Sequence, residues 1–174
     1  LDVRGTVALS APGEIDLATA GTLDLAVLSL VTDTARASGP VRFDVAATGP
    51  RQQPQVRGEA VLTDGSVVVD DPAAIAIEDL AARLDVAGAR LTLRDVSGLV
   101  NGGALTGSGT IDIGAGVIED ADLQLAIDDL AFSAPLDLRS LSDVGLRLAR
   151  RADTLVVSGD VRIAEAGLTG DINF

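Results

Sequence analysis

Arg57-Gly58-Glu59-Ala60-Val61-Leu62 is one of four copies of a short phrase that recurs along this chain of 174 residues. The others are Arg4-Gly5-Thr6-Val7-Ala8-Leu9, Ser108-Gly109-Thr110-Ile111-Asp112-Ile113 and Ser158-Gly159-Asp160-Val161-Arg162-Ile163. Their glycines are 53, 51 and 50 residues apart, and a second glycine follows each of them after seven or eight residues (Gly13, Gly65, Gly116 and Gly167). This period predicts one supersecondary unit stacked on copies of itself, so that function lies on a continuous surface.

Apolar and polar residues alternate throughout the chain, as in Val41-Arg42-Phe43-Asp44-Val45, which is typical of half-buried β-strands. Strands of about five or six residues would give four to six strands per unit. We therefore predict an all-β chain in which mainly antiparallel strands form one domain, residues 1–174. Hairpin turns are expected at Ala11-Pro12-Gly13, Thr63-Asp64-Gly65-Ser66, Gly114-Ala115-Gly116 and Glu165-Ala166-Gly167, and a loop at residues 49–54.

Several segments allow more than one local structure. Asp71-Pro72 could begin a helix over residues 75–86, but the neighbouring repeats favour two strands there, with a bulge near Asp79 and Leu80. A short helical turn is expected within residues 28–37. Residues 98–109 are rich in glycine, but they include no lysine and precede no helix, so they predict a turn and a bent strand rather than a phosphate site. Arg150-Arg151 predicts a hairpin tip.

The composition excludes several classes of function. The net charge is −13, and a chain this acidic lacks the basic surface that binds nucleic acid. There is no cysteine and no histidine, which excludes disulfides, thiolate or imidazole metal sites and Ser-His nucleophiles. The acidic residues fit a solvated face, because alternation points Asp112, for example, away from its apolar neighbours. We expect neither enzymatic activity nor a cofactor or metal ion.

The chain contains no methionine, so we expect it to be a segment of a longer protein. Its longest apolar stretch, residues 23–31, is interrupted by Asp24 and is much shorter than the ~20 residues of a membrane-spanning helix.

The aliphatic faces of the predicted strands must be hidden from water. Only three residues are aromatic (Phe43, Phe132 and Phe174), so valine, leucine, isoleucine and alanine make up this surface. A second sheet, closure of the sheet on itself or an apolar ligand could cover it. Physics alone favours a sandwich or a solenoid, although the period of about fifty residues argues against a β-helix.

Residues 47–65 resemble the TamB family of AsmA-like proteins. In this chain a glycine, the pair Gln53-Pro54 and a strand led by Gly58 follow one another in the order of that family. Residues 77–84, 88–93 and 102–111 continue in the order of that family. The resemblance covers nearly the whole chain and is strongest over residues 39–113.

This resemblance implies one elongated, curled, U-shaped sheet (a "β-taco") with an apolar concave groove. It further implies a central segment of a protein that is anchored in the inner membrane of a Gram-negative bacterium and crosses the periplasm. The groove would conduct phospholipid acyl chains between the membranes, and parts outside this segment would bind an outer-membrane barrel partner. The alternatives are a scaffold for the assembly of outer-membrane barrels or autotransporters, by strand addition at an open edge, and a surface-exposed adhesin-like repeat.

The candidate residues that line the groove are the alternating aliphatic residues and one phenylalanine. They are Val7, Leu9, Leu23, Leu25, Val41, Phe43, Val45, Leu62, Ile75, Ile77, Leu84, Val86, Leu91, Leu93, Ile111, Ile113, Leu123, Leu125, Ile127, Leu155, Val157, Val161 and Ile163. The sequence leaves open which face of each strand points inward, because a one-residue bulge exchanges the two faces.

Overall fold

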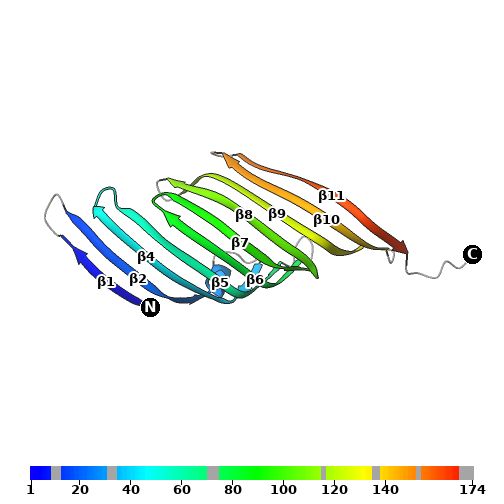
Figure 1. The fold of residues 1–174 in the computed structure, drawn as a ribbon, viewed down its shortest axis with the longest axis horizontal. Helices are drawn as coiled ribbons and strands as arrows, with labels where there is room; N and C mark the ends of the chain where they lie inside the picture. Colours follow the sequence, from blue (N-terminus) through cyan, green and yellow to red (C-terminus); the bar gives the residue numbers. More distant parts are fainter. Residues whose placement is uncertain are drawn as a thin grey trace, which may run out of the picture.

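The computed structural model describes residues 1–8, 13–30, 35–69, 75–114, 117–134, 138–151 and 154–168. Its eleven strands all belong to one sheet (Figure 1). The strands are β1 (Asp2–Val7), β2 (Glu14–Asp24), β3 (Ala35–Ser38), β4 (Pro40–Pro50), β5 (Gln55–Val69), β6 (Ile75–Ala87), β7 (Arg90–Val100), β8 (Gly103–Gly114), β9 (Val117–Ala134), β10 (Leu138–Arg151) and β11 (Thr154–Leu168). A short 3-10 helix, η1 (Leu25–Leu30), follows β2.

The sheet is an antiparallel meander that remains open. Its strand order is β1-β2-β4-β5-β6-β7-β8-β9-β10-β11, and β3 pairs with the far end of β5. β1 and β11 each have one neighbour and lie at opposite ends of the long axis (Figure 1). The predicted all-β, elongated antiparallel sheet is confirmed. The sandwich that physics alone favoured is wrong, because all the described strands join one layer.

Each repeat contributes three strands to the sheet path, and the expectation of four to six was wrong. The four glycine-led phrases lie on or begin in β1, β5, β8 and β11, which are three positions apart in the strand order. The strands from β4 to β11 are 11 to 18 residues long, about twice the length that we assumed. Because three is odd, successive glycine-led strands run in opposite directions.

The glycine that leads each repeat lies where two strand backbones come close together. A Cβ atom on Gly5, Gly58, Gly109 or Gly159 would lie closer than 3.0 Å to a carbonyl oxygen of the neighbouring strand. Space therefore requires glycine at these four positions, and this is the physical origin of the repeated phrase.

Register divides the side chains between two faces of the sheet. Residues directly opposite each other in a ladder point to the same side, and the pairs Val7–Ile15, Val45–Gly58 and Ile111–Ala121 all belong to one face. We call it the apolar face, and the other side, which carries pairs such as Arg90–Asp112, the polar face.

Register shifts interrupt the alternation on several ladders, and four β-bulges contain an aspartate with positive φ. They are Asp64 (φ 52), Asp79 (φ 51), Asp95 (φ 52) and Asp129 (φ 57), on β5, β6, β7 and β9. All four aspartates are exposed. We call these residues the bulge band. Asp64-Gly65 was predicted as a hairpin turn, which is wrong: the chain continues through it as one strand, because aspartate tolerates positive φ within a bulge.

A small apolar core lies on the apolar face beside the bulge band. Val96, Val100, Leu105 and Ile127 are only 6–8% exposed, although the described strands form a single layer. The residues that flank three of the bulges all belong to this cluster: Ile77 and Leu80, Leu93 and Val96, Ile127 and Leu130. The extra residue keeps both flanking side chains on one face and bends the strand. The sheet is therefore bent beside this core.

The ambiguous segments have mixed outcomes. Residues 75–87 form a strand with a bulge at Asp79, as expected. The helical turn begins earlier than predicted, at Leu25, and residues 35–37 are a strand. The loop before β5 and the turn at residues 101–102 are confirmed, whereas residues 115–116 of the turn predicted after Gly114 lie outside the described part.

Two further turn predictions are corrected. Arg150 and Arg151 are paired residues at the end of β10, and Glu165 to Gly167 are paired within β11. Residues 11–12 and 71–74 lie outside the described part.

Replacing Asp79 tests the bulge band. Asp79→Gly should leave the free energy of unfolding nearly unchanged, because glycine adopts positive φ freely, whereas Asp79→Val should cost about 1–2 kcal/mol. Urea unfolding followed by circular dichroism measures both. Asp44→Val, on the polar face of β4 with no positive φ, is the control and should not destabilise the sheet. Equal losses for the two valine variants would contradict this role of the bulge.

Candidate functional site: the apolar face

The register brings nearly all the candidate lining residues to the apolar face. Leu9 lies outside the described residues, and Leu25 begins η1 rather than a strand. The ladders place the others on one side of the sheet: Val7, Leu23, Val41, Phe43, Val45, Leu62, Ile75, Ile77, Leu84, Val86, Leu91, Leu93, Ile111, Ile113, Leu123, Leu125, Ile127, Leu155, Val157, Val161 and Ile163. Their shared position is a property of the strand pairing, whatever occupies the face.

Exposure of the apolar face varies along the sheet. Leu62 and Ile127, beside the bulge band, are each 8% exposed. Val157 and Val161 on β11 are 60% and 65% exposed, because no described strand lies on the other side of β11. The accessible part of this face is therefore greatest toward the ends of the sheet, and the core cluster contributes mainly to stability.

Sequence reasoning missed three of the most buried residues of this face, Val96, Val100 and Leu105. Strict alternation from Leu93 would put Val96 and Val100 on the opposite side. The bulge at Asp95 restores them to the apolar face and leaves Leu99 on the polar face. A signal was present, since two consecutive polar residues (Arg94-Asp95) precede Val96 where alternation would place one.

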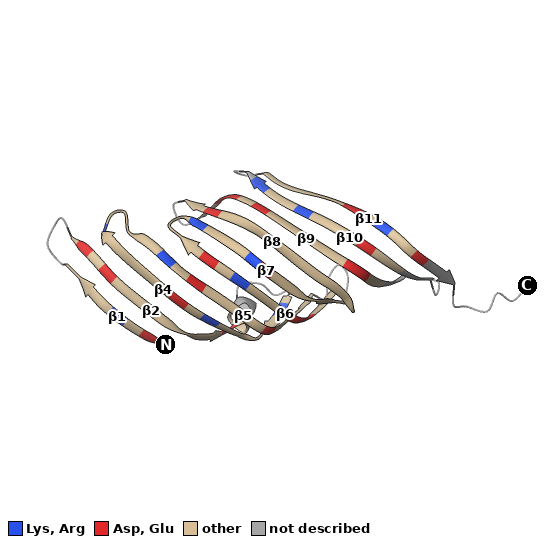
Figure 2. Cartoon of the chain, in the orientation of Figure 1, with Lys and Arg blue, Asp and Glu red and all other residues tan. Residues whose placement is uncertain are grey.

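Cross-strand ion pairs join neighbouring strands on the polar face, where acidic and basic residues are interspersed (Figure 2). Arg90 donates from Nε to Asp112 Oδ1 (2.8 Å) and from Nη2 to Asp112 Oδ2 (2.9 Å). Arg147 binds Asp122 in the same bidentate way, at 3.0 and 2.5 Å. Solvent screens such exposed pairs, so they fix the register more than they stabilise the sheet.

The hydrogen bonds from Arg90 lower the pKa of the Asp112 carboxyl below its usual range. The same hydrogen bonds raise the pKa of Arg90. Because the carboxyl pKa is lowered in the folded state, the pair stabilises the fold at neutral pH, and its contribution is lost as the pH falls through that lowered pKa.

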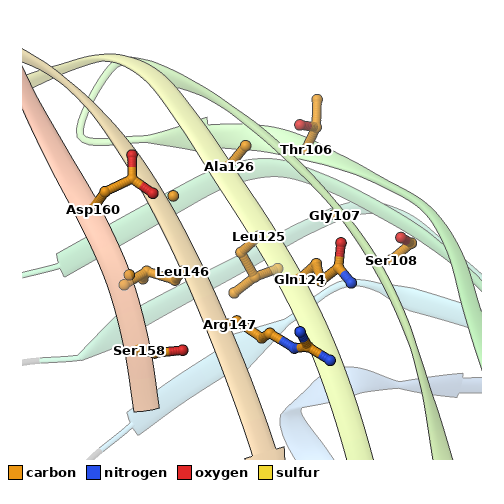
Figure 3. Close-up of a pocket in the computed structure, with 12 residues that line it drawn as sticks. Thr106, Gly107, Ser108, Gln124, Leu125, Ala126, Leu146, Arg147, Ser158 and Asp160 are labelled. Atoms are coloured by element: carbon orange, nitrogen blue, oxygen red, sulfur yellow. The ribbon is translucent and has the colours of Figure 1, made fainter.

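A shallow depression of about 790 Å³ lies on the polar face of β8 to β11 (Figure 3). Two cross-strand rows line it, Thr106-Ala126-Gly145-Asp160 and Ser108-Gln124-Arg147-Ser158. It exists because Ala126 and Gly145 have little or no side chain in the middle of a row. Asp122 already binds the guanidinium of Arg147, and the chain has no histidine that could activate a serine, so the depression offers hydrogen bonds rather than catalytic groups.

Among the described residues, no three acidic side chains are grouped so that they could hold a metal ion. The described part also contains no helix that is long and apolar enough to cross a membrane.

Fold and site together define an open, curled, single-layer antiparallel β-sheet whose aliphatic side chains lie mostly on one face. No protein-family model, curated protein or solved structure matches the chain.

Removing the Arg90 guanidinium should raise the Asp112 pKa toward its usual range. Carboxyl-carbon NMR titration of the Arg90→Gln variant measures this, with Arg94→Gln as the control because Arg94 pairs with Asp85 instead. An unchanged Asp112 pKa in Arg90→Gln would show that the bidentate pair does not persist in solution.

Proposed function

We propose that this chain binds phospholipid acyl chains on its apolar face and passes them along the sheet. The observation that carries the proposal is the sorting of aliphatic side chains from nearly every strand onto one face that no second layer of the described structure covers. Contiguous exposed apolar surface is unfavourable in water, at about 25 cal/mol per Å². A hydrocarbon ligand would relieve this cost without any specific hydrogen bond.

The shape of the face supports transport rather than a closed pocket. Ten strands in the main path, about 4.8 Å apart, extend the face over about 43 Å. An acyl chain spans about half of a 30 Å hydrocarbon core, or about 15 Å, so the face can hold chains at successive positions. The resemblance of residues 39–113 to the TamB family supports a periplasmic setting, an inner-membrane anchor and an outer-membrane barrel partner bound outside this segment.

A carboxylate on the apolar face should weaken acyl-chain binding. Leu123→Asp places a charge in the middle of the face, where a bound chain would have to desolvate it, and we expect at least a tenfold loss of affinity for a fluorescent fatty-acyl probe. The matched control is Gln124→Asp, one residue further on the polar face.

Circular dichroism must show that both variants are folded. The pair Val157→Asp and Ser158→Asp repeats the test on β11, where Val157 is 60% exposed and its replacement cannot open a core. Equal affinities for the two members of each pair would overturn the assignment of the apolar face.

A second candidate function, a scaffold for the assembly of outer-membrane barrels, is favoured by the edge of β11, which among the described strands pairs with β10 alone. This strand is 15 residues long, and its apolar-face residues Leu155 and Ile163 are 62% and 64% exposed. Long exposed edges accept additional strands.

Crosslinking distinguishes this function, because the chain has no native cysteine. A cysteine at Ser158, on the free edge, should crosslink to a nascent barrel, whereas one at Ser108, in the same cross-strand row but inside the sheet, should not. Equal crosslinking at both positions would contradict strand addition.

A further inference from the structure

The turn between β7 and β8 contains the one asparagine of the chain that precedes a glycine. Asn101 and Gly102 form a two-residue turn in which both residues have positive φ (46 and 88), and this is the geometry of a type I′ hairpin turn. Both residues are exposed. A glycine after asparagine leaves the main-chain nitrogen accessible, because it carries no Cβ that would shield it.

Ala76 on β6 holds this turn in place. Its main-chain nitrogen donates to Oδ1 of Asn101 (2.9 Å), and its carbonyl oxygen accepts from the main-chain nitrogen of Asn101 (2.9 Å). The ladder between β6 and β7 ends at the pair Ile77–Val100, so the asparagine side chain continues it by one position. Asn101 therefore joins the β7–β8 turn to the start of β6.

The side-chain amide of Asn101 and the main-chain nitrogen of Gly102 can react with each other when the turn opens. The Gly102 nitrogen attacks Cγ of Asn101, its proton passes to a base in the solvent, and the side-chain nitrogen leaves as ammonia. The product is a five-membered succinimide, which water opens at either carbonyl to give aspartate or isoaspartate. Because the turn is exposed, water and base reach it.

The folded turn opposes this reaction. In a type I′ turn the ψ of the first central residue is about +30°, which directs the Gly102 nitrogen away from the side chain that it would attack. The two hydrogen bonds with Ala76 hold the backbone and Oδ1 of Asn101 in that arrangement. Ring closure therefore requires these bonds to break, and a turn opens locally at a lower free energy than the whole fold.

We propose that Asn101 is a site of spontaneous deamidation in the folded protein, and that its hydrogen bonds with Ala76 set the rate. The aspartate product keeps a side-chain oxygen that accepts from Ala76. Isoaspartate places Cβ of residue 101 in the main chain, so the turn becomes one atom longer and its contact with the start of β6 is lost. The modification requires no ligand on the apolar face and is independent of acyl-chain binding.

The test incubates the purified chain at mildly alkaline pH and follows aspartate and isoaspartate at residue 101 by peptide mass spectrometry. Ala76→Pro removes the N–H that donates to Oδ1 and should speed the reaction of the folded chain about tenfold. The matched control, Ala76→Val, keeps that N–H and should leave the rate unchanged. Circular dichroism shows whether each variant is folded. Equal rates in the two folded variants would overturn the role of Ala76.

A comparison in urea needs no substitution. The unmodified chain should form product at residue 101 at least tenfold faster in urea than in buffer, because unfolding removes both hydrogen bonds. Asn173 is the internal control and should react more slowly than Asn101 in urea, since the bulky Phe174 follows it. If no product forms at residue 101 in buffer, the turn does not open in the folded protein. If the rates in buffer and urea are equal, Ala76 does not protect the turn, and either result contradicts the proposal.

Discussion

The register of the antiparallel ladders is the constraint on which the rest of this structure depends. Side chains alternate between the faces with a period of two, so a shift of one residue in any strand would move its aliphatic residues to the polar side. The repeat glycines fix this register by close approach, since a Cβ at Gly58 or Gly109 would collide with the adjacent backbone. Bidentate pairs such as Arg90–Asp112 fix it again from the opposite face.

Curvature allows a single layer to bury a core at all. A flat sheet would leave its apolar side chains in contact with water on one side, yet Val100 and Leu105 are each 6% exposed. The bulge band achieves this burial by adding one residue per strand and keeping the flanking side chains, such as Ile77 and Leu80, on the same face. The same bends that stabilise the sheet also give it the direction of its curl.

Much of this architecture could be predicted from sequence, because alternation is local and survives in every strand. The fold class, the repeat and the common face of the candidate residues all follow from that pattern. Asp64-Gly65 could not be interpreted locally, since aspartate before glycine suits a hairpin and a bulge equally well. Only the pairing with β6 distinguishes them, because Leu62 pairs with Ala82 and Gly65 pairs with Leu80 on the same neighbouring strand. Each aspartate of the bulge band directly follows another polar residue in the sequence, as Asp79 follows Glu78. Two consecutive polar residues that end in aspartate are therefore a sequence signal for these bulges.

The uniformity of the apolar face suits a ligand that moves. Phe43 is the one aromatic residue whose side chain the structure describes, and most of the described face is built from valine, leucine, isoleucine, alanine and glycine, with polar exceptions such as Thr19 and Ser142. Without large rings there are few deep notches in which a hydrocarbon would be trapped, and neighbouring strands present nearly equivalent rows. Under the proposed function, an acyl chain would be held at each position by contact area alone, without a specific pocket.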